Sequence, residues 1–383
     1  MSAAKIARRA ARAFCTTSDG HPLVDCSALT RRAGPARAAA VSEIGAALRE
    51  VGYFYASSVD ELPADYIASV YEYGARAHAL PPAVKRRFAQ KTGGGGSYSG
   101  ADIGEEHREL AYEAGTISTV RAWDYSRERF SLADKNAFPG ADVIQPPFEE
   151  FVDELYARQN TLARTLMVAF AEALELPKAT FASMFDGAGE GDYGTIRLLS
   201  YPGEAALSAE EAAAASVGIS AHTDFEAFTL MHQDAPGLQL LKRQGDGHAR
   251  EWTDAPVLPG AFLVIVGDVL ERMTNGEWRA TPHRVARTAH ARNALIRFNA
   301  VSATTLVQPL PKFVTAARPP RYSAVTMRTH METTMQNLAD GRGAWDSAKH
   351  KSLTATYLYI GGEDHRKVRS GEKKVGLGVR YVH

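Results

Sequence analysis

Ala221-His222-Thr223-Asp224-Phe225 places an imidazole and a carboxylate two residues apart, and the rest of the chain is best interpreted outward from this stretch. Side chains two apart on a β-strand point to the same face, so we expect His222 and Asp224 to converge. A later stretch, Thr281-Pro282-His283-Arg284-Val285, offers a second imidazole. Two histidines and one carboxylate form the facial triad that holds non-haem Fe(II) and leaves its remaining positions open. The sequence therefore predicts an Fe(II) site made by His222, Asp224 and His283.

Short apolar runs separated by Gly and Pro surround these residues. Their composition and length predict β-strands at residues 195–202, 225–231, 238–241, 261–266 and 294–301, the second continuing the strand that carries His222 and Asp224. Asn275-Gly276 is a hairpin signal that leads toward His283. Short strands at this spacing favour an α+β fold, a double-stranded β-helix (jelly-roll) barrel with flanking helices.

Residues 195–301 resemble the catalytic core of the 2-oxoglutarate- and Fe(II)-dependent dioxygenases of the type related to isopenicillin N synthase. The motifs that carry the resemblance occur in the family's order and at roughly its spacing: Tyr201-Pro202, His222-Thr223-Asp224, Pro236-Gly237-Leu238-Gln239-Leu240, Gly267-Asp268, Thr274-Asn275-Gly276 and His283-Arg284-Val285. The resemblance implies Fe(II) as the metal, with 2-oxoglutarate and O2 as co-substrates. It also implies oxidation, by default hydroxylation, of a C–H bond in a small-molecule substrate, with release of succinate and CO2.

The resemblance also implies which residues hold 2-oxoglutarate. In the family a Tyr at the position of Tyr201 and the Arg of an Arg-x-Ser motif do so, and the matching arginine is Arg292. The Ser of that motif is replaced by Ala294, which removes a hydroxyl donor to the distal carboxylate. Arg297 lies five residues after Arg292 and would face the other way on an alternating strand. Arg197 shares the face of Tyr201 and is either a second anion contact or part of an ordinary ion pair.

Composition excludes several classes of protein. The chain has 383 residues, 45% hydrophobic and 23% charged, which is ordinary for a soluble globular protein. Its formal net charge of zero predicts neither nucleic-acid binding nor attraction to an anionic membrane. No apolar run approaches the roughly 18 residues of a membrane span. Cys15 and Cys26 alone form neither a disulfide framework nor a Cys-based zinc site. We expect a monomer that acts on a small molecule.

The chain divides into four predicted parts. Residues 1–18 are rich in Arg and Ala and lack acidic residues, which is typical of a mitochondrial targeting segment or of a disordered terminus on a cytoplasmic protein. The cytoplasm is the prediction and the mitochondrion the alternative. Residues 20–135 resemble the family's N-terminal segment. Residues 136–345 are expected to form the jelly-roll core with its packing helices, and residues 346–383 a basic tail.

Three segments around the core are expected to be helical, the first of them on its helical periodicity. Residues 148–185 predict a long helix against the barrel, with a break marked by Pro177. Residues 203–218 predict a helical insertion at the mouth of the site, and residues 321–338 a C-terminal helix over the barrel. Tyr98 follows a Gly-rich run, where the resemblance implies a candidate contact to the substrate.

Two functions from other classes fit the same residues. One is an Fe(II) oxidase of this fold that does not use 2-oxoglutarate, which the missing hydroxyl at Ala294 favours. The other is a catalytically inactive jelly-roll binding module, against which the intact set of three metal ligands argues. The identity of the primary substrate, and the choice between hydroxylation, desaturation and ring closure, are not encoded in these motifs.

Overall fold

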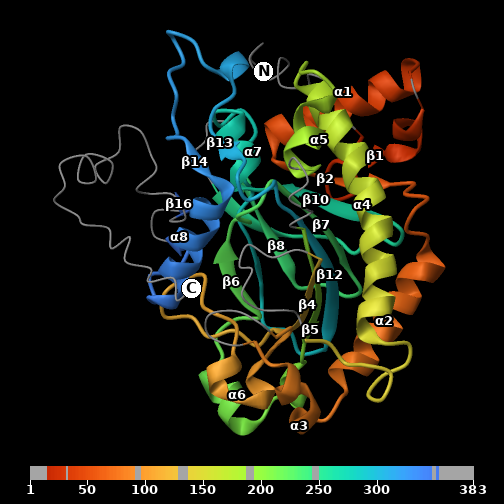
Figure 1. The fold of residues 1–383 in the computed structure, drawn as a ribbon, viewed down its shortest axis with the longest axis vertical. Coiled ribbons are helices and arrows are strands. Elements are labelled where there is room, and N and C mark those ends of the chain that lie inside the picture. Colours follow the sequence, from red (N-terminus) through yellow and green to blue (C-terminus); the bar gives the residue numbers. More distant parts are fainter. Residues whose placement is uncertain are drawn as a thin grey trace, which may run out of the picture.

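A computed structural model describes residues 15–31, 33–90, 96–127, 137–186, 194–243, 250–346 and 351–352. Two β-sheets occupy its centre, and helices lie around them (Figure 1). The helices are α1 (Pro35–Glu50), α2 (Ala64–His78), α3 (Pro82–Lys85), α4 (Phe148–Ala173), α5 (Ala179–Asp186), α6 (Ala209–Ala214), α7 (Asp268–Met273) and α8 (Met327–Ala339). Residues 1–14 of the predicted targeting segment and residues 353–383 of the predicted tail lie outside the described residues.

The two sheets form a jelly roll. The larger sheet has the strand order β1-β2-β10-β7-β12-β5-β4-β3, and the smaller has β6-β11-β8-β9. The consecutive strands β5 to β12 are shared equally between the sheets, as in a double-stranded β-helix, so the predicted fold is confirmed. The strands of these sheets are β1 (Leu23–Asp25), β2 (Tyr53–Ser57), β3 (Tyr98–Ser99), β4 (Arg121–Ser126), β5 (Thr195–Tyr201), β6 (Ile219–His222), β7 (Phe228–Gln233), β8 (Leu238–Arg243), β9 (Arg250–Asp254), β10 (Phe262–Val266), β11 (His283–Val285) and β12 (Arg292–Asn299).

The N-terminal segment extends the larger sheet at both edges. β2 pairs antiparallel with β10, with Phe54 opposite Val264, and β4 pairs antiparallel with β5, with Trp123 opposite Leu198. Two short two-stranded ladders complete the described strands, β13 (Leu306–Val307) with β14 (Val325–Thr326) and β15 (Trp345–Asp346) with β16 (Lys351–Ser352). Because β2 and β4 flank the barrel strands, β10 and β5 have a paired neighbour on each side, as β7 and β12 do within the barrel, which fixes the positions of the side chains they carry.

α4 runs along the barrel (Figure 1), and its buried residues are mostly apolar. The ring of Phe170 meets the rings of Phe228 and Trp278 edge to face, at centroid distances of 5.1 and 5.6 Å. α4 ends at Ala173, and α5 begins only after Pro177. The predicted break is confirmed. Its physical reason is that proline lacks an N–H and disfavours helical backbone in the residue before it.

Asn275-Gly276 does not form the predicted hairpin but ends α7. Both residues have positive φ, 53° and 77°. The N–H of Gly276 donates to the carbonyl of Glu271 at 2.8 Å, and that of Asn275 to Arg272 at 3.0 Å. A helix end and a tight hairpin both need left-handed backbone, which Asn and Gly adopt readily, so the dipeptide alone does not distinguish them.

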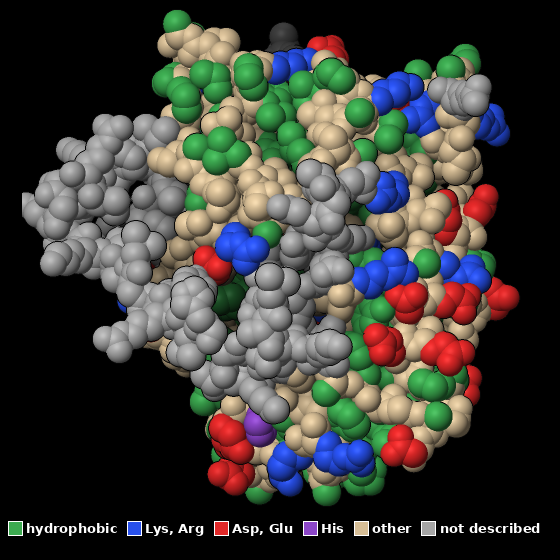
Figure 2. Space-filling model, in the orientation of Figure 1, with side chains coloured by type: hydrophobic (Ala, Val, Ile, Leu, Met, Phe, Trp, Pro, Cys, Tyr) green, Lys and Arg blue, Asp and Glu red, His purple; other side chains and the backbone are tan. Residues whose placement is uncertain are grey.

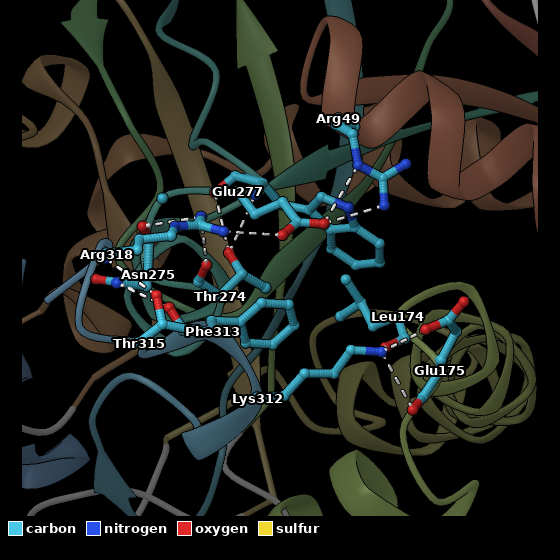
Figure 3. A network of polar contacts seen from close by, with 12 residues as sticks. Arg49, Leu174, Glu175, Thr274, Asn275, Glu277, Lys312, Phe313, Thr315 and Arg318 are labelled. Carbon is cyan, nitrogen blue, oxygen red and sulfur yellow. Dashed lines mark hydrogen bonds and ion pairs between the residues drawn. The ribbon is translucent and has the colours of Figure 1, made fainter. Parts of the chain in front are cut away.

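The turn at Asn275 anchors a polar network shown in Figure 3. The Asn275 side chain donates to the carbonyl of Phe313 at 3.0 Å, and Glu277 accepts from Arg49 of α1 at 3.0 Å and from Arg318 at 3.1 Å. Nearby, Lys312 donates to the carbonyl of Leu174 at 2.6 Å and so satisfies the end of α4. The network ties α1 and residues 313–318 to the segment that leads into His283.

The surface carries charges of both signs. On the face that Figure 2 displays, Lys and Arg side chains are interspersed with Asp and Glu side chains, in keeping with the formal net charge of zero. Among the helices in the described part of the chain, none combines the length and the apolar character that a membrane span requires.

Candidate active site

The three predicted metal ligands lie together in the fold. His222 Nε2 is 3.8 Å from Asp224 Oδ1, and His283 Nε2 is 3.5 Å from the same oxygen. The two imidazole centroids are 4.3 Å apart. One ligand atom from each residue lies within 4.8 Å of the other two, and all three residues are buried. Within the described ranges Asp224 has no Lys or Arg partner, so no basic side chain there neutralises this buried carboxylate, as expected of a metal ligand.

Sheet register and a crossover between the sheets bring the ligands together. β11 pairs antiparallel with β6 so that His283 lies directly opposite His222, and opposite residues present their side chains to the same face. The prediction that residues 225–231 continue the ligand strand is wrong. β6 ends at His222, and Asp224 lies in the connection that crosses to β7 in the larger sheet. The bend between the sheets, rather than strand alternation, directs Asp224 toward the two histidines.

Backbone carbonyls orient both imidazoles. His222 Nδ1 is 2.8 Å from the carbonyl of Ser220, and His283 Nδ1 is 3.1 Å from that of Thr281. Each Nδ1–H therefore donates to the backbone, and each Nε2 keeps its lone pair for the common centre. Burial, reinforced by the adjacent His283, lowers the pKa of His222 well below its ordinary value and keeps the ring neutral. A neutral imidazole is the form that binds a metal.

The loop that carries Asp224 is held from both sides. The hydroxyl of Thr229 donates to Oδ2 of Asp224, which leaves Oδ1 facing the imidazoles. The N–H of Asp268 donates to the carbonyl of Asp224 at 2.9 Å. A Cβ added at Gly267 would lie 2.3 Å from the carbonyl of Glu226, so this close approach requires glycine. The Gly267-Asp268 motif thus fixes the ligand loop by backbone contacts.

Tyr112 stacks on His222 from the N-terminal segment. Their ring centroids are 4.4 Å apart and their planes differ by 17°. The N–H of Tyr112 donates to the Ser220 hydroxyl at 3.1 Å, and its hydroxyl donates to Glu109 Oε1 at 2.9 Å. Tyr112 therefore limits rotation of the His222 ring and connects it to the acidic residue Glu109.

Arg292 and Tyr201, the predicted 2-oxoglutarate contacts, face each other across β12 and β5. They are directly opposite in register, and the guanidinium carbon lies 4.5 Å from the centre of the Tyr201 ring. Arg292 is 1% exposed and donates to Gln233 Oε1 at 2.9 Å. Its Nη1 has no hydrogen-bond partner, and no carboxylate of the described residues forms an ion pair with it. Such a buried, uncompensated cation is costly unless an anion binds it.

Arg297 and Arg197 have other partners. The guanidinium carbon of Arg297 lies 4.1 Å from the Tyr156 ring of α4, so Arg297 faces away from Arg292 as predicted. Arg197 donates through Nη2 to Glu109 at 2.8 Å and through Nε to Asp124 at 2.7 Å. Of the two alternatives left open for Arg197, the ordinary ion pair is the one observed.

A cavity of about 350 Å³ opens beside the three candidate ligands. His222 and Asp224 form part of its wall, as does the buried group of Arg197, Glu109 and Asp124. Met331, Met335 and Leu338 of α8 and Phe298 of β12 supply apolar wall, which agrees with the predicted C-terminal helix over the barrel. Tyr201 and Arg292 are not among the described residues that line this cavity.

Two sequence expectations about the mouth of the site are wrong. Tyr98 does not border the cavity, since its ring packs 4.7 Å from that of Trp123 and its hydroxyl donates to Asp102 at 2.8 Å. Residues 203–218 do contain a helix, α6, but Glu211 on it pairs with Arg121 at 3.2 Å, and no residue of this segment lines the described cavity wall. Residues 106–110 and Tyr112 line the cavity instead.

Comparisons with known proteins place the chain in a family. Residues 196–304 match the model of the 2OG-Fe(II) oxygenase superfamily, and residues 21–133 match that of the non-haem dioxygenase in morphine synthesis N-terminal family. The chain is 26% identical over 320 residues to the 2-oxoglutarate-Fe(II) type oxidoreductase hxnY of Emericella nidulans, covering 80% of this chain and 86% of the relative. It is 30% identical over 283 residues to the 2-oxoglutarate-Fe(II) type oxidoreductase ppzC of Metarhizium majus, covering 69% and 72%.

The chain belongs to the 2-oxoglutarate and Fe(II) oxygenase superfamily. Its fold matches the crystal structure of a full-length Neurospora crassa protein in complex with alpha-KG and 5-formyluracil, with a TM-score of 0.68 at 21% identity, covering 85% of this chain and 98% of that one. The family resemblance seen in the sequence is confirmed, and the protein is a 2-oxoglutarate-dependent non-haem iron oxygenase that uses Fe(II), 2-oxoglutarate and O2. Family membership argues against the oxidase without 2-oxoglutarate and against the inactive binding module.

The buried charges of the oxygenase fit both missing groups. Among the described residues, Asp224 lies beside two imidazoles and has no Lys or Arg partner, and Arg292 has no carboxylate partner. Fe(II) would supply the cation for Asp224, and a carboxylate of 2-oxoglutarate the anion for Arg292. The two sites thus need opposite charges, which a divalent metal with a dianionic co-substrate provides.

Sequence reasoning missed several residues of this oxygenase's site. Thr229 lies two residues before Met231 and four before Gln233 on β7, and strand alternation could have placed all three on one face. Tyr112 and Glu109 carry no such signal. They lie in a segment without regular strand or helix, and only the fold brings them against His222 and Arg197.

Proposed function

We propose that His222, Asp224 and His283 hold Fe(II), and that Arg292, packed on Tyr201, binds the distal carboxylate of 2-oxoglutarate. The observation that carries the proposal is that the same barrel buries a carboxylate, Asp224, and a guanidinium, Arg292, each without a partner of opposite charge among the described side chains. Among the described residues, Asp224 has the imidazoles of His222 and His283 beside it and no Lys or Arg partner, and Arg292 has a free Nη1 and no carboxylate partner. Each charge would be costly to bury without the partner that we assign to it.

The protein's own residues would orient the reactants and exclude water. Fe(II) with 2-oxoglutarate and O2 supplies the oxidant that attacks a C–H bond, with release of succinate and CO2. The carbonyls of Ser220 and Thr281 hold the imidazoles in the tautomer that leaves Nε2 available. Tyr112 and Thr229 restrain His222 and Asp224. Fixed ligands of this kind raise metal affinity and preserve the open coordination face.

The cavity supports a small molecule as the substrate. A volume of about 350 Å³ suits a metabolite, and its wall combines apolar side chains from α8 with the charged residues Glu109, Arg197 and Asp124. We propose hydroxylation as the default outcome for the C–H bond nearest the metal. A monomeric state and a cytoplasmic location, with the mitochondrion as alternative, stay predictions.

Anaerobic reconstitution tests the metal and co-substrate assignments. Fe(II) is added to the wild-type protein, followed by 2-oxoglutarate, and the visible charge-transfer band of the chelate is recorded. We expect the band in wild type and in a control, His290→Ala, which changes an exposed histidine, and its loss in His222→Ala. Equal iron content and equal bands in His222→Ala and wild type would refute the metal site.

Turnover tests the co-substrate. Succinate formed and O2 consumed are measured during oxidation of a hit from a metabolite library, followed by mass analysis of the product. The proposal expects one succinate per O2 and a product heavier by one oxygen atom. Product without succinate would remove 2-oxoglutarate from the reaction, and a product that has lost two hydrogens would replace hydroxylation by desaturation or ring closure.

A further inference from the structure

Asp124 of β4 presents an incompletely satisfied carboxylate to the cavity. Its Oδ1 accepts from Arg197 Nε at 2.7 Å and its Oδ2 from Gln90 Nε2 at 2.8 Å. A carboxylate has about four lone-pair positions, so roughly two remain available on Asp124 within the described structure. Glu109 differs, because it accepts from Arg197 twice, from Tyr112 and from Ser99. Of the two acids that pair with Arg197, Asp124 therefore retains acceptor capacity on the cavity side.

The group around Asp124 also carries excess negative charge. Two carboxylates share the single guanidinium of Arg197, and the side chains of Glu109, Asp124 and Arg197 are only 11%, 16% and 8% exposed. Burial opposes ionisation of Glu109, yet Arg197 pairs with it strongly enough to lower its pKa. Burial raises the pKa of Asp124 despite Arg197, and the charge of Glu109 adds to that effect. A second cation beside Asp124 would relieve this repulsion.

The other basic residues of the described cavity wall are already paired. Arg108 forms an ion pair with Glu105 at 2.6 Å, and His107 lies 3.6 Å from Glu106. Because Arg197 is shared by two acids, no basic side chain in the described lining stands without an acidic neighbour. An anionic substrate group entering here would meet acidic side chains before an open cation.

We propose that the substrate of this oxygenase carries a cationic nitrogen group, an ammonium or a guanidinium, that donates to Asp124. Its apolar part lies against Met331, Met335 and Phe298, which line the cavity. The proposal rests on the proposed function, since the bond to be oxidised must lie near the iron held by His222, Asp224 and His283. It names Asp124 as the residue that selects substrates by charge.

Matched pairs of probes test this selection. The full-length protein, loaded anaerobically with Fe(II) and 2-oxoglutarate, is titrated with phenethylamine against phenylacetate and with tryptamine against indole-3-acetate. Each pair shares an aromatic body and differs in the sign of its charge. We expect each amine to bind at least about tenfold more tightly than its carboxylate partner, because a charge-assisted hydrogen bond inside a protein contributes about 10- to 100-fold in affinity.

Variants test whether the preference for amines depends on the charge of Asp124. Asp124→Asn keeps the shape and removes the charge, so the preference for amines should fall by about tenfold or more while the charge-transfer band is retained. Glu154→Gln removes an acidic charge from an exposed ion pair on α4 and should leave the preference unchanged. Three results would each overturn the inference: carboxylates bind as tightly as amines, none of the four probes binds, or Asp124→Asn keeps the wild-type preference. Loss of the band in wild type would refute the proposed function instead.

Discussion

Replacing Arg292 by methionine tests whether this arginine binds an anion or stabilises the fold. In the protein without 2-oxoglutarate, Arg292 makes one short hydrogen bond to Gln233, a long and therefore weak one of 3.4 Å to the carbonyl of Ala235, and one contact with the Tyr201 ring. The bond to Gln233 contributes about 1.5–3 kcal/mol and the ring contact about 0.5–2 kcal/mol, and the 3.4 Å bond adds little. Against them stands a desolvation cost of several kcal/mol for a buried ion without a counter-charge. The favourable contacts and the desolvation cost nearly cancel. Arg292→Met should therefore raise or lower the free energy of unfolding by no more than about 1 kcal/mol.

The same replacement at Arg197 is the matched control and should behave oppositely. Arg197 is paired with Glu109 at 2.8 Å and with Asp124 at 2.7 Å, and its loss leaves two buried carboxylates side by side. Removing one partner of a buried ion pair costs about 3–5 kcal/mol. Arg197→Met should therefore lower the midpoint of urea unfolding clearly, while Arg292→Met should not.

Affinity for 2-oxoglutarate completes the comparison. A guanidinium that makes two charge-assisted hydrogen bonds to a carboxylate contributes at least about 3 kcal/mol, so Arg292→Met should weaken binding by roughly a hundredfold or more. Urea unfolding of the metal-free proteins and anaerobic titration of 2-oxoglutarate into the Fe(II)-loaded proteins measure the two quantities. If Arg292→Met unfolded as easily as Arg197→Met, or kept wild-type affinity for 2-oxoglutarate, the assignment of Arg292 as an anion site would be wrong.

Three further predictions concern the ligand environment, the turn after α7 and pH. Tyr112→Leu removes the ring stacked on His222 and should weaken Fe(II) binding about tenfold in competition with a chelator, whereas Tyr112→Phe should not; equal affinities would contradict the positioning role. Asn275→Ala loses the side-chain bond to Phe313 and places Ala at positive φ, so unfolding should become easier by about 2–4 kcal/mol, and a loss below about 1 kcal/mol would count against the network. Burial lowers the pKa of His78 to about 4 from 6.5, so the unfolded chain binds more protons between these values and stability is lost as pH falls from 6.5 to 4. Roughly 2 kcal/mol of that loss should disappear in His78→Gln when unfolding is compared at pH 7 and pH 4.5, and identical losses would refute the reasoning.

Much of the barrel could be predicted from local sequence. The strands β5, β10 and β12 are apolar runs bounded by turn residues or loops. Such a run is typical of a strand buried in a sheet, so it could be predicted locally. The break after α4 was predictable because Pro177 restricts the backbone in every context. The Asn275-Gly276 turn was not, because left-handed backbone serves a helix end as well as a hairpin. Local rules identify a conformation, whereas the element that uses it depends on what packs nearby.

The chemistry of the candidate site divides in the same way. The residue types at His222, Asp224 and His283 indicated an Fe(II) site from the sequence alone, and the oxygenase activity followed from the family resemblance of residues 195–301. Alternation along β5 and β12 could assign Arg197 and Arg292 to a face of the sheet, but not their partners. Glu109 and Asp124 reach Arg197 from other segments, while Arg292 is left without a carboxylate in the described structure. Which arginine remains open to an anion was decided only by the tertiary structure, because neutralisation of a buried charge depends on distant residues that folding brings within a few ångströms.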